Sequence, residues 1–241
     1  MGDLADDIEA RLREIGSPER AEGEKRYLKS DLEFIGVTLG HIRGVVRDVH
    51  GPLSHDELIT VATQLWARPI FDRRLAAVML LERFAVELAP SDLPLIERLV
   101  RESRTWALVD AIADDVLGRI VLAAPDGMVA EMDRWSADDD FWVRRSSVLC
   151  ELRPIRKGQP LDRFLARADA MLEEREFFIR KAIGWVLREA GKRRPGEVAA
   201  WLGPRTHRAS GVTMREAVKY LPADTGASLM EAYRRHEPAT R

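Results

Sequence analysis

Trp106-Ala107-Leu108-Val109-Asp110 is one of four segments of this chain that begin alike. The others are Phe71-Asp72-Arg73-Arg74, Trp142-Val143-Arg144-Arg145 and Phe178-Ile179-Arg180-Lys181, so an aromatic residue returns at intervals of 35, 36 and 36 residues. A fifth segment, Met214-Arg215-Glu216-Ala217, begins another 36 residues on. Self-similarity at this period is typical of stacked helical repeats. Because the repeats share a scaffold, we look for function where they differ: the second carries the acid Asp110, whereas its neighbours carry Arg74, Arg145 and Lys181 nearby.

The rest of the chain also follows the helical period. Ser17-Pro18 predicts a helix with proline at its first position, and Ser54-His55-Asp56-Glu57 is a capping box. Further helices are expected within residues 4–15, 75–88, 106–122, 141–152, 161–172 and 177–190. No alternating pattern bounded by a hairpin turn stands out. The sequence therefore predicts an all-α fold, a HEAT-like helical-repeat solenoid (an α-α superhelix) of about six helical pairs with a concave binding face, forming one domain over residues 1–241.

Composition is that of an ordinary globular protein, with 46% hydrophobic and 32% charged residues among 241. The one cysteine, Cys150, excludes an intramolecular disulfide and fits a reducing compartment. No apolar run reaches the ~18 residues of a membrane span. The first residues are acidic and lack the basic and apolar regions of a signal peptide. We therefore expect a cytoplasmic protein, monomeric and with no membrane partner.

Charge is distributed unevenly along the chain. Residues 1–120 hold 16 Lys/Arg against 22 Asp/Glu, whereas residues 141–219 hold 18 against 9. A basic half in a nearly neutral chain suggests a surface that faces a polyanion such as nucleic acid. A solvated, arginine-rich surface without such a partner is the alternative.

Several chemically distinctive side chains recur at matching places in the repeats. Counted from each helix start, one helical stripe holds Trp106, Asp110, Trp142, Arg145, Lys181 and Trp185, and Arg188 continues it. Stacking would bring an acid, indoles and cations to one groove. The opposite side of the Asp110 helix is apolar (Leu108, Val109, Ile112 and Val116), so we expect Asp110 to be half exposed. The alternatives are that the indoles only pack between helices, that Asp110 pairs with Arg145 or Arg104, and that Arg145 is solvated or ion-paired.

Other kinds of chemistry lack their motifs. The five histidines are scattered, with no HExxH and no Cys/His pair, so neither a metal nor a cofactor is expected. GxGxxG, Walker and GxSxG sequences are absent from the chain. Cys150 lies in an apolar run, which favours a buried thiol over a nucleophile.

At these residues the sequence resembles the AlkD-like DNA alkylation repair glycosylases, a HEAT-like-repeat family, over roughly residues 8 to 225. The resemblance is carried by Arg26-Tyr27-Leu28-Lys29 with Phe34-Ile35-Gly36-Val37, by Trp106-Ala107-Leu108-Val109-Asp110 with Leu117-Gly118, by Trp142-Val143-Arg144-Arg145, and by the stretch from Glu176 to Glu189 that contains Ala182-Ile183-Gly184-Trp185. Where the family often has Ser-Trp-Trp-Asp, this chain has Arg104-Thr105-Trp106-Ala107. That departure bears on substrate range more than on reaction class.

The resemblance implies roles for individual residues. Asp110 would be the catalytic carboxylate, and Trp106 and Trp185 would flank the deoxyribose of the lesion. Arg145 would contact the DNA backbone, with Trp142, Arg144, Lys181 and Arg188 as further DNA-binding residues, and Tyr27 would lie near the lesion. The implied partner is double-stranded DNA containing alkylated purines.

The implied reaction is hydrolysis of the bond between the sugar and a cationic N7-alkylguanine or N3-alkyladenine, by a monofunctional DNA glycosylase that has no enclosing base pocket. A fixed carboxylate suits that reaction because positive charge develops on the sugar as the bond breaks. Two alternatives stay open: the same chemistry specialised for bulky natural-product adducts, and a helical-repeat scaffold that binds DNA or protein without catalysis.

Overall fold

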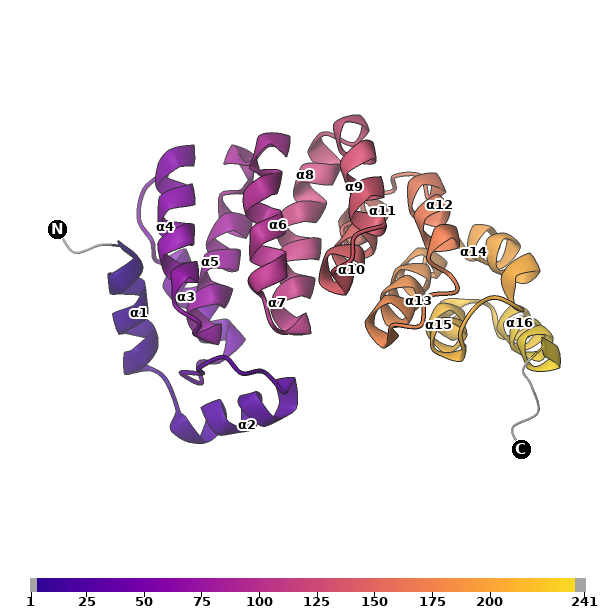
Figure 1. Cartoon of the computed structure of the whole chain (residues 1–241), viewed down its shortest axis with the longest axis horizontal. Helices are drawn as coiled ribbons and strands as arrows, with labels where there is room; N and C mark the ends of the chain where they lie inside the picture. Colours follow the sequence, from indigo (N-terminus) through magenta and orange to yellow (C-terminus); the bar gives the residue numbers. More distant parts are fainter. Residues whose placement is uncertain (1–3, 237–241) are drawn as a thin grey trace. The chain divides into compact units, whose positions relative to one another are not determined.

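The computed structural model describes residues 4–236, and most of these are helical (Figure 1). The chain divides into two compact units, Met1–Ala124 and Pro125–Arg241. The all-α prediction is confirmed: within the described range the only extended pairing is one isolated bridge between Glu33 and Ile70. The single domain predicted from the sequence stays a prediction, and each unit is described by itself.

The first unit contains a run of helices and one π-helical segment: α1 (Leu4–Glu14), α2 (Pro18–Leu28), α3 (Leu39–Arg47), α4 (His55–Ala67), α5 (Phe71–Arg83), α6 (Leu93–Glu102), α7 (Trp106–Ala111), the π-helix (Ile112–Leu117) and α8 (Gly118–Ala123). The second unit contains α9 (Val129–Ser136), α10 (Phe141–Leu149), α11 (Leu152–Arg156), α12 (Asp162–Ala170), α13 (Phe177–Gly191), α14 (Pro195–Leu202), α15 (Gly211–Ala217) and α16 (Ala223–His236).

The recurring aromatic residues stand where the sequence predicts helix starts. Phe71 and Trp106 are the first residues of α5 and α7, and Trp142 and Phe178 are the second residues of α10 and α13. The helices that they begin pack against their equivalents: α3 on α5 and α5 on α7 in the first unit, and α10 on α13 and α13 on α15 in the second (Figure 1). The prediction of stacked helical repeats is therefore confirmed within each unit.

The repeat period reappears in the polar contacts between helices. His55 bonds Asp92 at 2.8 Å across 37 positions, and the Trp66 indole donates to Glu102 at 2.8 Å across 36. In the second unit, Arg205 donates to Asp169 at 2.8 Å, again across 36 positions. Equivalent places in successive repeats are thus joined directly, which fixes the register of the stack.

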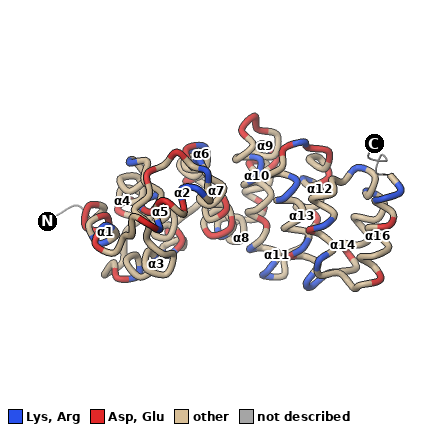
Figure 2. The backbone as a smooth tube through the Cα atoms, turned by 90° about the horizontal axis from the view of Figure 1, so that it is seen from below, with Lys and Arg blue, Asp and Glu red and all other residues tan. Residues whose placement is uncertain are grey.

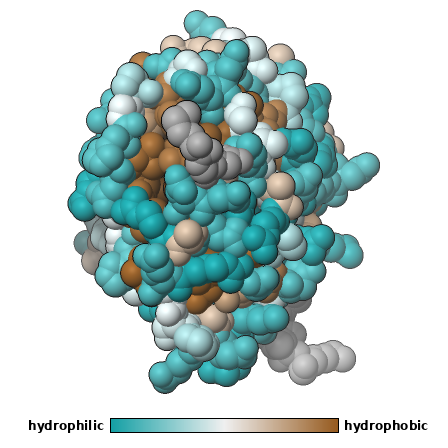
Figure 3. Space-filling model, turned by 90° about the vertical axis from the view of Figure 1, so that its left-hand side faces the viewer, coloured by the Kyte–Doolittle hydropathy of each residue, from teal (hydrophilic) through white to brown (hydrophobic). Residues whose placement is uncertain are grey.

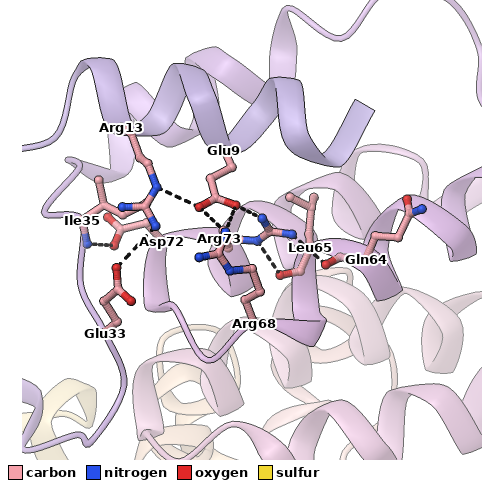
Figure 4. Close-up of polar contacts among 9 residues, drawn as sticks. All are labelled: Glu9, Arg13, Glu33, Ile35, Gln64, Leu65, Arg68, Asp72 and Arg73. Carbon is pink, nitrogen blue, oxygen red and sulfur yellow. Dashed lines mark hydrogen bonds and ion pairs between the residues drawn. The ribbon is translucent and has the colours of Figure 1, made fainter. Parts of the chain in front are cut away.

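A buried ion-pair network ties α1 to α4 and α5 (Figure 4). The Glu9 carboxylate, 6% exposed, accepts from Arg73, from Arg68 at 2.7 Å and from Arg13 at 2.8 Å. Arg73 also donates to the carbonyls of Gln64 and Leu65, near the end of α4. Each of these buried charges makes several hydrogen bonds, which offset the free energy lost when the charges leave water.

Helix α1 packs on the first unit through one apolar side. Ala5, Ile8 and Leu12 of α1 are buried, whereas Asp6 and Asp7 are exposed. The face of the molecule seen in Figure 3 is mostly hydrophilic, with smaller apolar patches.

Three expected helices differ in detail, and the one expected over residues 141–152 ends at Leu149, with α11 beginning at Leu152. The helix expected over residues 75–88 ends at Arg83 and continues as a 3₁₀ turn, Ala85–Glu87, because i to i+3 hydrogen bonds tighten the chain before Pro90. The segment expected over 106–122 is continuous but contains the π-helix. Among residues 4–236, no helix is both long and apolar enough to cross a bilayer.

Candidate functional site

Tyr27 and Trp106 meet at one edge of the first unit. Their rings lie edge to face, with centroids 6.0 Å apart and planes at 78°. Tyr27 is 73% exposed although it is aromatic, and Trp106 is half-buried. The structure therefore brings together two of the residues that the sequence analysis singled out, from α2 and α7.

The C-terminal end of α2 is held against the start of α7. Lys29 adopts a left-handed conformation (φ 49°) that ends the helix and reverses the chain. The Ser30 hydroxyl then donates to the carbonyl of Arg104 at 3.5 Å, and Arg104 pairs with Asp31 at 2.9 Å. These contacts fix Tyr27, two residues before the turn, beside Trp106.

The N-terminal end of α2 is held by the segment that follows it. Gly36 has φ 82°, and a Cβ at this position would come within 2.2 Å of the Ser17 carbonyl oxygen, so only glycine fits. The buried carboxylate of Asp72 accepts from the backbone N–H groups of Ile35 at 2.7 Å and Val37 at 2.8 Å (Figure 4 shows the first). Asp72 therefore holds the backbone of residues 35–37 against the start of α5.

Asp110 lies one turn beyond Trp106 on α7 and is half-buried. Leu108, Val109, Ile112 and Val116 are fully buried, as predicted, so Asp110 is on the side of the helix that reaches the surface. The π-helix begins two residues after Asp110. Such wide turns are costly to form and occur frequently at functional sites.

A largely apolar cavity of about 430 Å³ opens beside Trp106. We call it the Trp106 cavity; it is lined by Arg20, Glu24, Tyr27, Leu28, Val37, Leu39, Phe71, Leu75, Trp106, Ala107 and Ala111. Trp106, Ala107 and Ala111 bring α7 to the cavity, whereas Asp110, one turn after Trp106, is not among the residues that line it. Glu24 did not stand out in the sequence, because a lone acid on an exposed helix carries no motif.

In the second unit, Trp142 belongs to an aromatic cluster. Its ring lies 4.8 Å from that of Phe178, its equivalent in the next repeat, and 4.3 Å from that of Phe141. Phe177 is 54% exposed and lies edge-on to Phe178. The packing role weighed for the repeat tryptophans thus describes what Trp142 does in this structure, while its predicted DNA contact stays a prediction.

The two arginines after Trp142 are engaged within the protein. Arg145 is buried, and its guanidinium donates to the carbonyl of Phe178 at 2.5 Å and lies over that ring. Arg144 pairs with Glu174 at 2.9 Å and donates to the carbonyl of Asp138 at 2.6 Å. Arg145 thus ties α10 to the start of α13, and Arg144 ties α10 to the loops before α10 and before α13.

The remaining predicted cations meet on one carboxylate of α15. Glu216 accepts from Lys181 at 2.5 Å, from Arg188 at 2.6 Å and from Lys219 at 2.8 Å. Burial alone would raise the pKa of Glu216, but hydrogen bonds from the two lysines and the nearby charges outweigh it and lower the pKa to about 2. Three cations around one anion leave a local excess of positive charge, and Trp185, which stands between Lys181 and Arg188 in α13, is half-buried.

The predicted site residues therefore fall into two groups. Tyr27, Trp106 and Asp110 belong to the first unit, whereas Trp142, Arg144, Arg145, Lys181, Trp185 and Arg188 belong to the second. Figure 2 shows where Lys and Arg positions lie along each unit. The second unit holds 22 Lys/Arg against 18 Asp/Glu, and the first holds 16 against 22 up to residue 120. Within residues 4–236, no three or more His, Cys, Asp and Glu side chains gather in a way that could hold a metal ion.

Comparisons with known proteins agree on family and fold. The chain matches the family of DNA alkylation repair enzymes over residues 8–221. A structure from Enterococcus faecalis, described as a predicted DNA alkylation repair enzyme, superposes with a TM-score of 0.75 at 22% identity, over 86% of this chain and 97% of that one. No curated protein matches the chain.

Two structures from Streptococcus mutans share the fold. AlkD2 aligns with a TM-score of 0.62 at 15% identity, over 86% of this chain and all of that one. The protein smu.31 aligns with a TM-score of 0.61 at 15% identity, over 88% of this chain and all of that one. The likeness to these structures concerns the helical-repeat fold, whereas the family match spans most of the sequence. The chain therefore belongs to the DNA alkylation repair enzyme family.

Proposed function

We propose that this protein is a monofunctional DNA glycosylase that removes cationic N7-alkylguanine and N3-alkyladenine from double-stranded DNA by hydrolysis. Membership of the DNA alkylation repair enzyme family supports the biological role. The observation that supports the chemistry best is local: the half-buried carboxylate of Asp110 lies one turn from Trp106, whose ring meets the exposed ring of Tyr27.

The departure of the base needs little catalytic assistance. Alkylation makes the purine cationic and hence a good leaving group, so the barrier lies in the positive charge that develops on the deoxyribose. In our proposal Asp110 stabilises that charge and orients the attacking water. One fixed charge of this kind supplies about 3–4 kcal/mol, judged from single-group deletions at other active sites. Trp106, one turn before Asp110, would face the sugar and exclude bulk water, and the role of Trp185 beside the sugar stays a prediction.

The cations of the second unit would hold the phosphates and set the register without reading sequence. Lys181, Arg188 and Arg144 remain partly exposed although each forms an ion pair with a carboxylate of this chain. Arg145 is the most enclosed of the four, so a phosphate contact would require its guanidinium to leave the Phe178 carbonyl. We therefore assign the larger part of phosphate binding to the first three.

The activity is tested by incubating the protein with methylated duplex DNA and separating the soluble products by chromatography. We expect free 7-methylguanine and 3-methyladenine, with DNA strands that stay intact until alkali cleaves the abasic sites. Asp110→Asn should release little base, whereas Asp115→Asn, five residues on in the same continuous helix, should behave like the native protein. Tight DNA binding by the native protein without base release would instead identify a non-catalytic scaffold.

A further inference from the structure

Four arginines surround a second, smaller cavity of the first unit. We call it the arginine pocket; its volume is about 230 Å³, and it is lined by Arg43, Arg47, Arg83 and Arg119, by the acid Glu82 and by two apolar side chains. These residues come from α3, α5 and α8. The pocket shares no lining residue with the Trp106 cavity. Its side chains carry four positive charges against one negative charge.

Two of the arginines repel each other on one helix. Arg43 and Arg47 stand four positions apart on α3, and like charges at this spacing destabilise a helix. The guanidinium of Arg43 has no hydrogen-bond or ion-pair partner among residues 4–236. Arg47 lies 3.6 Å from Asp48, but Asp48 also pairs with Arg11 at 2.9 Å. The protein therefore relieves little of this repulsion by itself.

The other two arginines are held in place by main-chain carbonyls. Arg83 donates to the carbonyls of Val46 and Arg47, the second at 2.7 Å. Arg119 donates to the carbonyl of Asp115 at 3.1 Å and pairs with Glu82 at 3.2 Å. A neutral carbonyl orients a guanidinium without cancelling its charge. Two cations are thus positioned at the pocket before a ligand arrives, which lowers the entropic cost of binding.

The chemistry and size of the pocket indicate the class of ligand. Guanidinium groups match the oxygens of phosphate with paired hydrogen bonds. The volume lies below the range of about 300–1,000 Å³ that is usual for sites of drug-sized molecules, so the ligand is compact. Residues 1–120 hold 22 acids against 16 bases, so a long polyanion would meet net repulsion from the rest of this unit, whereas a compact anion meets the local positive charge.

We propose that the arginine pocket binds a compact, multiply charged phosphate group, either as inorganic diphosphate or as the terminal phosphates of a small metabolite. The site goes beyond the proposed glycosylase activity, because none of its residues has a role in base release.

Isothermal titration of the full chain with inorganic pyrophosphate, at constant ionic strength, tests the proposal. We expect one pyrophosphate bound per chain. Arg43→Gln should weaken this binding about tenfold, because a hydrogen bond between charged groups is lost. The matched control is Arg98→Gln on α6, since Arg98 is an exposed arginine outside the pocket. Its affinity should equal that of the native protein.

A substitution at Glu82 should act in the opposite direction. Glu82→Gln removes the one acid of the pocket and releases Arg119 from its ion pair, so pyrophosphate should bind several-fold more tightly. Loss of folding cannot produce tighter binding, so this variant tests the charge of the pocket and not its stability. Unchanged affinity in both Arg43→Gln and Glu82→Gln, or no binding to the native protein, would overturn the proposal.

Titrations of an undamaged DNA duplex at several salt concentrations distinguish a free phosphate from a backbone phosphate. We expect Arg43→Gln to bind the duplex like the native protein, with the same dependence on salt. If Arg43→Gln instead weakened duplex binding and lowered the salt slope by about 1, while pyrophosphate did not bind, the arginines would contact DNA and the small-anion site would be excluded. None of these outcomes depends on base release, so the pocket and the glycosylase activity are tested separately.

Discussion

The ring of Tyr27 lies edge to face against that of Trp106, with centroids 6.0 Å apart, although 79 positions separate the two residues in the sequence. Tyr27 is 73% exposed, so the contact does little for the core. Exposed aromatic residues that the fold holds in place are typical of binding surfaces.

From this contact we expect Tyr27→Ala to lower the rate of base release at limiting DNA by about tenfold, while changing the free energy of unfolding by less than about 0.5 kcal/mol. The control is Tyr220→Ala in the second unit, where the tyrosine is 56% exposed. Activity and urea denaturation of both variants check the prediction. A Tyr27→Ala protein that is fully active would remove Tyr27 from the site.

Gly184 allows α13 and α15 to approach closely. A Cβ at Gly184 would lie 2.7 Å from the Glu216 Cβ and 3.0 Å from the Thr213 carbonyl oxygen. Gly184→Ala should therefore destabilise the protein by about 1–3 kcal/mol through overpacking. Gly196 lies in α14 with nothing within 4 Å of a Cβ, so Gly196→Ala should be neutral or stabilising by up to about 1 kcal/mol. If urea denaturation gave the same change in the free energy of unfolding for Gly184→Ala and Gly196→Ala, the close packing at Gly184 would be contradicted.

The cluster around Glu216 makes stability depend on pH. Its folded pKa of about 2 lies below the ordinary value of 4.5, so its contribution is complete above pH 4.5 and is lost as the pH falls towards 2. Because Lys181 and Lys219 are partly exposed, we expect Glu216→Gln to cost only about 1–2 kcal/mol at neutral pH. The difference between native and variant should shrink steadily below pH 4.5.

Stability of both proteins at a series of pH values measures this difference. Glu197→Gln serves as the control, because Glu197 is an exposed acid on the neighbouring α14. We expect it to change stability by less than about 0.5 kcal/mol. A deficit for Glu216→Gln that stayed constant down to pH 2 would mean that its carboxylate is not held by the three cations.

Much of the fold follows from local signals. The 36-residue return of an aromatic residue predicts where α5, α7, α10 and α13 begin, and Ser54 caps α4 as its capping box predicts. The apolar spacing also predicts which side of α7 is buried. These features depend on residues near one another in sequence, which is why a single sequence contains them.

The partners of the charged side chains could not be predicted in the same way. Arg145 and Lys181 occupy equivalent helical positions. Arg145 is buried and donates to the carbonyl of Phe178, whereas Lys181 forms an ion pair with Glu216. Those partners lie about one repeat away, and helical spacing does not reveal them. The π-helix after Asp110 and the arginine pocket likewise depend on tertiary packing.

The most direct measurement is the single-turnover rate of 7-methylguanine release by Asp110→Asn, with enough protein to saturate the DNA. We expect a rate at least about 100-fold below that of the native protein, with DNA affinity nearly unchanged, because the carboxylate acts on charge that exists only in the transition state. A variant that releases base at the native rate would contradict the role of Asp110 and the proposed chemistry with it.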